Sequence, residues 1–117
     1  MNAKDFAENY IMHDSLIDLV EVLNGGNTIG MHIDFAFWMQ KGYNDSDPET
    51  GTLKVTFFDV SSYAIPENAD WNAISILEMR AVEDGILFSL MNDMTDDYLE
   101  IRIRSNRIIV ESVPNAK

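Results

Sequence analysis

Three consecutive residues near the N-terminus, His13, Asp14 and Ser15, carry the side chains from which serine hydrolases build an activated nucleophile. Such a triad needs the hydroxyl about 2.6–3.2 Å from the imidazole, and it takes its members from separate chain segments. Neighbouring residues of a strand point to opposite faces, and residues two apart stand ~6.5 Å apart. The stretch therefore predicts the boundary between a helix and the first strand, where Asp14 or Ser15 binds nearby backbone N–H groups.

The second histidine, His32, shares one face of a predicted strand with Asp34, and Glu21 or Asp18 lies across from them in the preceding strand. Histidine beside carboxylates can bind a metal ion or act as a general base. The chain has 2 histidines and no cysteine, so a dedicated metal site would consist mostly of carboxylates. We expect a cross-strand polar pairing on a solvated face, with no metal and no other cofactor.

Three acids at alternate positions, Asp45, Asp47 and Glu49, are spaced like the first ligands of a calcium-binding loop. Such loops need a glycine at the sixth position and a bidentate acid at the twelfth, where this chain has Thr50 and Thr56. The segment 40–51 is polar and rich in turn-forming residues. It predicts an exposed loop between strands.

Four aromatic residues fall at strand ends or in loops beside acids: Trp38, Tyr43, Tyr63 and Trp71. Tryptophan or tyrosine within a charged rim is typical of the residues that dominate protein–protein binding. The alternative is that at least two of the four cover the open ends of the hydrophobic core. These aromatic residues are better evidence for a function than the histidines, and they favour a protein-binding surface.

The elements that position these residues follow from the hydrophobic periodicity, which predicts a short N-terminal helix over 3–12 and strands thereafter. The strand-forming segments are 15–23, 28–39, 52–65 with a bulge or bend near its two phenylalanines, 73–93 with a turn at Asp84–Gly85, and 97–113 with a connection near Ser105 and Asn106. About seven antiparallel strands with short turns indicate a mainly β single domain, residues 1–117. We expect a meander that forms a sandwich or a strongly curved, partly closed sheet.

The register of the first hairpin is open between two alternatives. A two-residue turn at Gly25–Gly26 would place Leu16, Val20 and Val22 on the apolar face, with Asp18 as the exception. A one-residue change in the loop would instead place there Ile17, Leu19 and Leu23, with Glu21 as the exception.

The composition is strongly acidic, because 20 Asp and Glu against 8 Lys and Arg give a formal net charge of -12. Such a field repels nucleic-acid phosphates and anionic membranes and attracts cationic partners, although the charge can also serve solubility alone. The sequence has no cysteine, no signal-peptide pattern and no long apolar run. These features predict a cytoplasmic protein that binds neither nucleic acid nor a membrane.

The chain resembles a group of small acidic bacterial proteins in which an apolar residue and His-Asp-Ser open a hydrophobic strand, here from Met12. The pattern L-x-V/F-x-F-x-x-V of that group is matched by Leu53, Val55, Phe57 and Val60. The C-terminal "EIRIRSNRIIVE", residues 100–111, is similar to the β-hairpin that ends these proteins. Some members are uncharacterised, and others resemble immunity proteins of polymorphic or contact-dependent toxin systems.

The resemblance implies a non-enzymatic protein that neutralises a cognate toxin by covering its active site. Many such toxins are basic nucleases, and the charge of this chain would accelerate association with one. Loop acids would meet the cationic groove, aromatic residues would be the anchors, and the expected interface residues are Trp38, Tyr43, Asp45, Asp47, Glu49, Asp70 and Trp71. The alternatives are a structural or regulatory homodimer that uses an apolar sheet edge and, third, a small hydrolase or metal-binding protein.

Overall fold

The computed structural model describes residues 1–67 and 69–115, and it contains one α-helix and eight strands in that part of the chain. The helix is α1 (Ala3–Asn9). The strands are β1 (Leu16–Leu23), β2 (Thr28–Ala36), β3 (Thr50–Phe58), β4 (Ser62–Ala64), β5 (Ile74–Val82), β6 (Gly85–Asn92), β7 (Tyr98–Arg104) and β8 (Arg107–Pro114). Short 3-10 helices occupy Asn24–Gly26, Phe37–Met39 and Trp71–Ala73.

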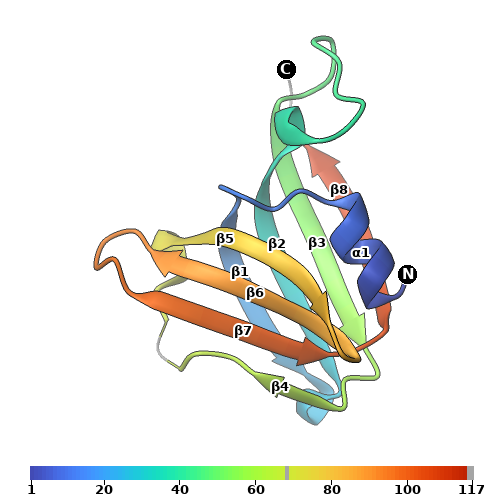
Figure 1. Ribbon diagram of the computed structural model, residues 1–117, viewed down its shortest axis with the longest axis vertical. Coiled ribbons are helices and arrows are strands. Elements are labelled where there is room, and N and C mark those ends of the chain that lie inside the picture. The colour runs from blue at the N-terminus through green and yellow to red at the C-terminus, as the bar shows by residue number, and fades with distance from the viewer. Residues whose placement is uncertain (68, 116–117) are drawn as a thin grey trace.

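All eight strands belong to one antiparallel sheet, with the order β4-β7-β6-β5-β1-β2-β3-β8. Two three-stranded meanders, β1–β2–β3 and β5–β6–β7, are joined where Leu16 pairs with Ser75. In Figure 1 the strands β5, β6 and β7 lie in front of β1, β2, β3 and β8 and cross them at an angle. The prediction of a mainly β, strongly curved sheet with one short helix is confirmed, and the sheet does not close into a barrel.

The curvature is imposed by two short links between opposite edges of the sheet. Strands β7 and β8 are six positions apart in the strand order, yet only Ser105 and Asn106 connect them. Six spacings of a flat sheet would measure ~29 Å, whereas such a link spans roughly 11 Å. Residues 59–61 connect β3 to β4 in the same way. The edges must therefore approach each other at this end, which we call the closed end.

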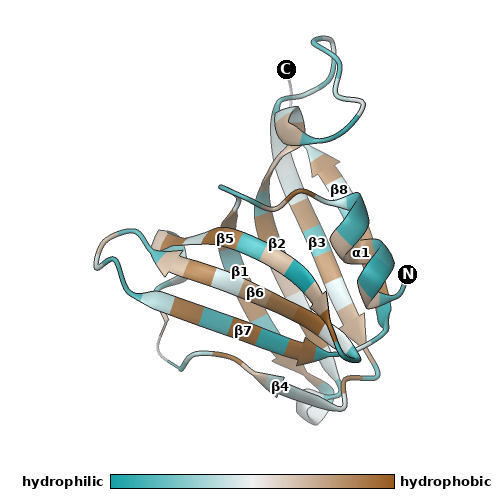
Figure 2. Cartoon of the chain, in the orientation of Figure 1, coloured by the Kyte–Doolittle hydropathy of each residue, from teal (hydrophilic) through white to brown (hydrophobic). Residues whose placement is uncertain are grey.

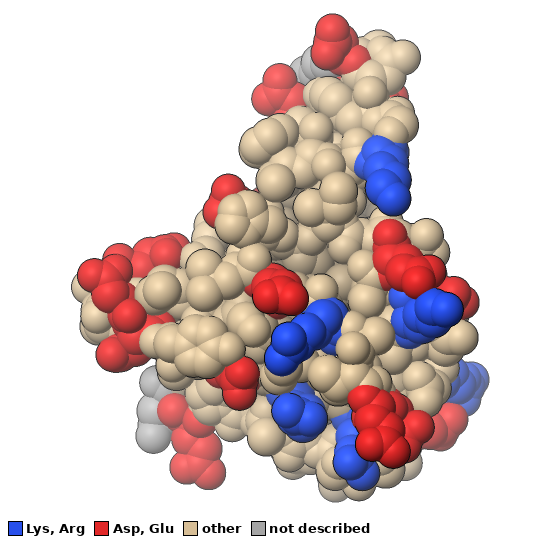
Figure 3. Space-filling model, viewed as in Figure 1, with Lys and Arg blue, Asp and Glu red and all other residues tan. Residues whose placement is uncertain are grey.

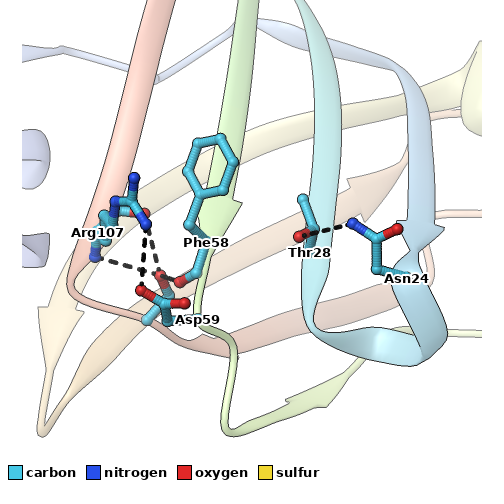
Figure 4. Close-up of polar contacts among 6 residues, drawn as sticks. Asn24, Thr28, Phe58, Asp59 and Arg107 are labelled. Atoms are coloured by element: carbon cyan, nitrogen blue, oxygen red, sulfur yellow. Dashed lines mark hydrogen bonds and ion pairs between the residues drawn. The ribbon is translucent and has the colours of Figure 1, made fainter.

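Polar contacts fix the crossing at the closed end, as Figure 4 shows. The Ser105 hydroxyl donates to the carbonyl oxygen of Phe58 at 2.6 Å. The Arg107 guanidinium lies 3.5 Å from the Asp59 carboxylate and 4.9 Å from the centre of the Phe58 ring. These contacts hold the end of β3 against the start of β8.

The crossing corrects two predictions about the C-terminal half. The segment 100–111 is not a β-hairpin, because β7 pairs with β6 and β4 whereas β8 pairs with β3. The segment 52–65 forms two strands rather than one, and of the predicted bulge or bend it has the bend, since the pairing of β3 is regular as far as Phe58. Asp59 then turns the chain with a φ of 52°, and β4 begins at the other edge.

Helix α1 covers the gap that remains between the two layers of the curved sheet (Figure 1). Its inner side chain Phe6 is fully buried, with ring centroids 6.0 Å from Phe57 and 5.5 Å from Tyr10. Figure 2 shows that α1 is largely hydrophilic and that hydrophobic and hydrophilic residues alternate along the strands. The helix ends at Asn9, earlier than predicted, because Tyr10 is extended and the Gln40 amide group binds both backbone groups of Ile11.

A β-bulge at Asp18 decides the register of the first hairpin. Ile17 pairs with the buried Ile33, and the register then shifts so that Val20 and Val22 pair with Met31 and Ile29. The inner face of β1 thus carries Ile17, which one predicted register placed there, together with Val20 and Val22, which the other register placed there. Asp18 itself is exposed.

None of the helices in residues 1–67 and 69–115 is long and apolar enough to cross a membrane.

Candidate functional site

The predicted interface residues all lie at the end of the sheet opposite the closed end, which we call the open end. A continuous cross-strand row fixes this position: Asp34 pairs with Leu16, Leu16 with Ser75, Ser75 with Met91, and Met91 with Tyr98. The connections beyond this row are 10–15, 37–49, 65–73 and 93–97. The fold therefore brings the segments that carry Trp38, Tyr43, Asp70 and Trp71 to one end of the molecule.

The connections of the open end are strongly acidic. Figure 3 shows acidic side chains on the loop at the top of the view and at the left, where the connections 37–49 and 93–97 lie. Lys41 is the one lysine or arginine of the four connections, as far as the structure describes them. The acids of these connections are Asp14, Asp45, Asp47, Glu49, Glu67, Asp70, Asp93, Asp96 and Asp97. The open end is consequently the part of the surface best suited to a cationic partner.

The connection between β2 and β3 is held by its own polar groups. The Asp47 carboxylate accepts a hydrogen bond from the backbone N–H of Asn44 at 3.1 Å, and the Tyr43 hydroxyl donates to the Asp47 carbonyl at 3.2 Å. Because the Asp47 carboxylate stabilises the turn, it is a structural residue as well as a surface charge. In the described residues no group of three or more acid, histidine or cysteine side chains could hold a metal ion.

Tyr43 lies at the edge of a small, mostly apolar pocket of ≈ 280 Å³ on this connection. Its pKa is raised by partial burial and then by the carboxylates of Glu49, Asp45 and Asp47. The phenol therefore stays protonated and can donate a hydrogen bond over a wider pH range than a free tyrosine. The pocket is lined by Phe37, Gln40, Lys41, Gly42, Tyr43, Asp47, Pro48 and Pro114.

The two tryptophans of the open end differ in exposure. Trp38 lies in the 3-10 helix that follows β2, and 53% of it is exposed. Trp71 is half-buried and packs against the hydrophobic core, while Asp70 caps its short helix by accepting from the Asn72 N–H at 3.1 Å. Of the two tryptophans, Trp38 therefore has more area left for a partner, and Trp71 has mainly a packing role.

The structure adds Met94, which sequence reasoning missed, to this surface. Met94 is 80% exposed at the tip of the β6–β7 connection, between Asp93 and the acids Asp96 and Asp97. The Asn92 side chain holds this turn by accepting from the Met94 N–H at 2.9 Å. A single apolar residue inside an acidic run was the available signal, but the sequence does not show that this turn lies at the same end of the sheet as the β2–β3 connection.

The residues His13, Asp14 and Ser15 join the start of β1 to β5. The His13 Nδ1 atom donates to the Leu77 carbonyl at 2.9 Å, the Asp14 N–H donates to the Ile76 carbonyl at 2.9 Å, and the Ile76 N–H donates to the Ser15 carbonyl at 2.8 Å. The Ser15 hydroxyl is buried without a hydrogen-bond partner, so it does not contact His13. No local triad forms, and the expected tie comes from backbone groups and the His13 ring rather than from the Asp14 or Ser15 side chain.

His32 lies on the outer face opposite Leu19 of β1 and Lys54 of β3, so the expected cross-strand partner in β1, Glu21 or Asp18, is not the residue directly across from it. The pKa of the nearby Asp18 is raised by burial and by Asp34, and it is lowered in part by His32. Beside this group, the absence of a side chain at Gly30 leaves a hollow of ≈ 220 Å³ in the outer face of the sheet.

No protein-family model matches the chain, and comparisons with curated proteins and with solved structures also return no match.

Proposed function

We propose that this protein is a non-enzymatic binding module whose open end engages a basic partner protein. The observation that carries this proposal is that the loop acids and two exposed apolar side chains, Trp38 of the β2–β3 connection and Met94 of the β6–β7 connection, lie on connections at the same end of the sheet. Exposed aromatic and methionine side chains surrounded by charge are typical of the centre and rim of protein interfaces. The curved sheet supports the loops that present them.

The resemblance to immunity proteins suggests a more specific role, in which the partner is a bacterial toxin and the open end masks its active site. A basic nuclease groove would complement the acids of this end. Long-range attraction would raise the association rate, and added salt would lower it because ions screen the exposed charges. The acids Asp45 and Glu49 are placed to provide this attraction, since their carboxylates have no structural hydrogen bond in the described part of the chain.

The test is co-expression and co-purification with a toxin encoded beside this protein, followed by kinetic binding measurements. Exchanging Asp45 for Asn and Glu49 for Gln should slow association about tenfold at low salt. Exchanging Glu83 for Gln and Asp84 for Asn removes the same charge at the closed end and should leave association nearly unchanged. Failure to form a complex with such a toxin, or equal effects of the two double variants, would contradict the proposal.

A structural homodimer is the second candidate, and one observation favours it. Among the described residues, the N-terminus covers the outer edge of β8 at Ile108, and the side chains of Ile109 and Val113 are exposed beside the rest of that edge. The net charge of -12 on each copy opposes this association. Sedimentation measurements at several concentrations distinguish the candidates, because a stable dimer without any partner would favour the homodimer.

A further inference from the structure

Strand β1 lies between β5 and β2 in the strand order, but most of its backbone edge on the β5 side is unpaired. Its pairing with β5 consists of Leu16 with Ser75, next to the backbone bonds that Asp14 and Ser15 make to Ile76. Beyond this point β1 and β5 diverge, as Figure 1 shows. From Ile17 to Leu23, therefore, β1 has β2 on one side and no strand on the other side within the described residues.

The alternation of hydrogen bonds identifies the groups on this edge. Ile108 of β8 bonds outward to Met1 through both its N–H and its C=O, so its partner Phe57 points its own groups toward β2. Phe57 pairs with Ile29, and Ile29 pairs with Val22. Because hydrogen-bonded and non-hydrogen-bonded pairs alternate in antiparallel sheets, Val22 must point its groups away from β2.

The same alternation places the N–H and C=O of Val20 on the free edge. No other described group bonds to the edge side of Val20 or Val22. Two donors and two acceptors, spaced as a pairing strand would need them, therefore have no hydrogen-bond partner among the described residues. A partner strand would satisfy them with regular backbone hydrogen bonds.

The side chains around this edge are apolar or acidic. Val22 is 46% exposed and Leu23 is 41% exposed, whereas Asp18 and Glu21 supply negative charge. The strand has no proline and no lysine, which natural proteins often place on edges to prevent pairing. By contrast, the β8 edge is capped by Met1 at one end and ends in Pro114 at the other.

We propose that the β1 edge accepts an extended basic segment of a partner protein as an additional strand. Lysine or arginine residues of that segment would lie beside Glu21 and Asp18 on one face, and its apolar residues would lie beside Val20 and Val22 on the other face. A second copy of this chain fits less well, because pairing Val20 with Val22 of the other copy would place Glu21 opposite Glu21. The net charge of -12 adds to that repulsion. This surface is separate from the open end and goes beyond the proposed function.

The test uses a blocked peptide of about nine residues with alternating lysine and valine, a typical strand length or slightly more. NMR hydrogen exchange on the full chain should show about tenfold slower exchange at Val20 and Val22 when the peptide is bound. The amides of Glu21 and Leu23, which bond to β2, should change little. A peptide with glutamate in place of lysine, and one N-methylated at alternate positions, should each bind at least about tenfold more weakly.

Two variants examine the edge itself. Val22→Pro removes an outward N–H without removing a bond to β2, so it should fold and should weaken peptide binding about tenfold, whereas Val22→Thr keeps the N–H and should bind like the original protein. Glu21→Lys keeps the backbone and reverses one exposed charge, and it should also weaken peptide binding. This variant tests the proposal even if Val22→Pro does not fold.

Three results would overturn the proposal: no binding of the lysine peptide, binding without protection of Val20 and Val22, or protection of both amides in a dimer without peptide. Exchanging Asp45 for Asn and Glu49 for Gln at the open end should leave peptide binding unchanged. This comparison separates a failure at the β1 edge from a failure of the proposed open-end function.

Discussion

The hydroxyl of Ser105 donates a 2.6 Å hydrogen bond to the carbonyl oxygen of Phe58, and this contact ties the β7–β8 link to the end of β3. The two residues are 47 positions apart in the chain, and they meet because the sheet curls until its edges approach. The bond is partly buried, so loss of the hydroxyl leaves a carbonyl group poorly solvated.

Exchanging Ser105 for Ala should therefore lower the free energy of unfolding by about 1–2 kcal/mol. The matched control is Ser15→Ala, because the Ser15 hydroxyl is equally buried but has no partner in the described structure. That variant should be neutral or slightly stabilising. Urea denaturation of both proteins checks the pair, and a larger loss for Ser15→Ala would contradict the assignment of these two hydroxyl groups.

A Cβ atom at Gly85 should be far more costly than one at Gly30. At Gly85 it would lie 2.8 Å from the Cα of Arg104 and closer still to the Ile103 carbonyl oxygen, which are both backbone atoms of β7. At Gly30 the nearest atom would be Cδ1 of Leu23 at 3.9 Å. We expect Gly85→Ala to lose about 2 kcal/mol or more of unfolding free energy through forced backbone movement.

Gly30→Ala should change the unfolding free energy by less than about 1 kcal/mol, and it should tend to stabilise β2 because glycine weakens a strand interior. Thermal denaturation of the two glycine variants measures the contrast. Equal losses in the two would mean that the hollow beside Gly30 is not open space.

The carboxyl group of Asp18 should weaken the fold slightly when it is ionised. Burial and Asp34 raise its pKa above the ordinary value of 3.8, so the folded state binds this proton more tightly than the unfolded state does. The contribution of Asp18 to stability therefore falls as the pH rises from its unfolded pKa through its folded pKa, and it stays reduced at neutral pH.

Asp18→Asn should in consequence stabilise the protein at pH 7, by less than about 1 kcal/mol because the group is exposed to solvent. The gain should disappear near pH 3, where the carboxyl group is protonated in both states. Urea denaturation of both proteins at the two pH values tests this. A gain that is the same at both values would point to a cause other than the charge.

The phenol of Tyr43 should ionise only above its ordinary pKa of 10.0, because partial burial and the carboxylates of Glu49, Asp45 and Asp47 disfavour the phenolate. Its titration is obtained as the difference in ultraviolet absorbance between the original protein and Tyr43→Phe. Exchanging Asp45 for Asn and Glu49 for Gln should move this titration to lower pH. An unchanged midpoint would show that these loop acids do not act on Tyr43.

Part of the open-end surface was accessible to sequence reasoning because its signals are local. The acids Asp45 and Glu49 stand in the polar, turn-rich segment 40–51, and such a segment must lie on the surface to solvate its backbone, while Trp38 stands at the end of the strand predicted just before it. Met94 was missed, since its importance comes from the end of the sheet at which its turn lies. Trp71 was predicted as an interface residue, but whether a half-buried tryptophan faces the core depends on packing against distant strands.

The sequence by itself determined the class of the fold and the faces of regular strands. The alternation from Ile29 to Phe35 is strict, and the structure buries Ile29, Met31, Ile33 and Phe35 as the pattern requires. Side-chain alternation is a property of each extended chain segment, so it needs no knowledge of neighbouring strands. The charge and the absence of cysteine were equally independent of the fold.

Only the tertiary structure decided how strands choose their partners. The link at Ser105–Asn106 is short enough for a hairpin, yet it crosses between the two edges of the sheet. The bulge at Asp18 chose the face of β1, and the divergence of β1 from β5 left Val20 and Val22 on an open edge. Each of these features depends on hydrogen bonds between residues far apart in the chain. The stability of such a pairing depends on both strands, whereas a local sequence pattern describes one strand at a time.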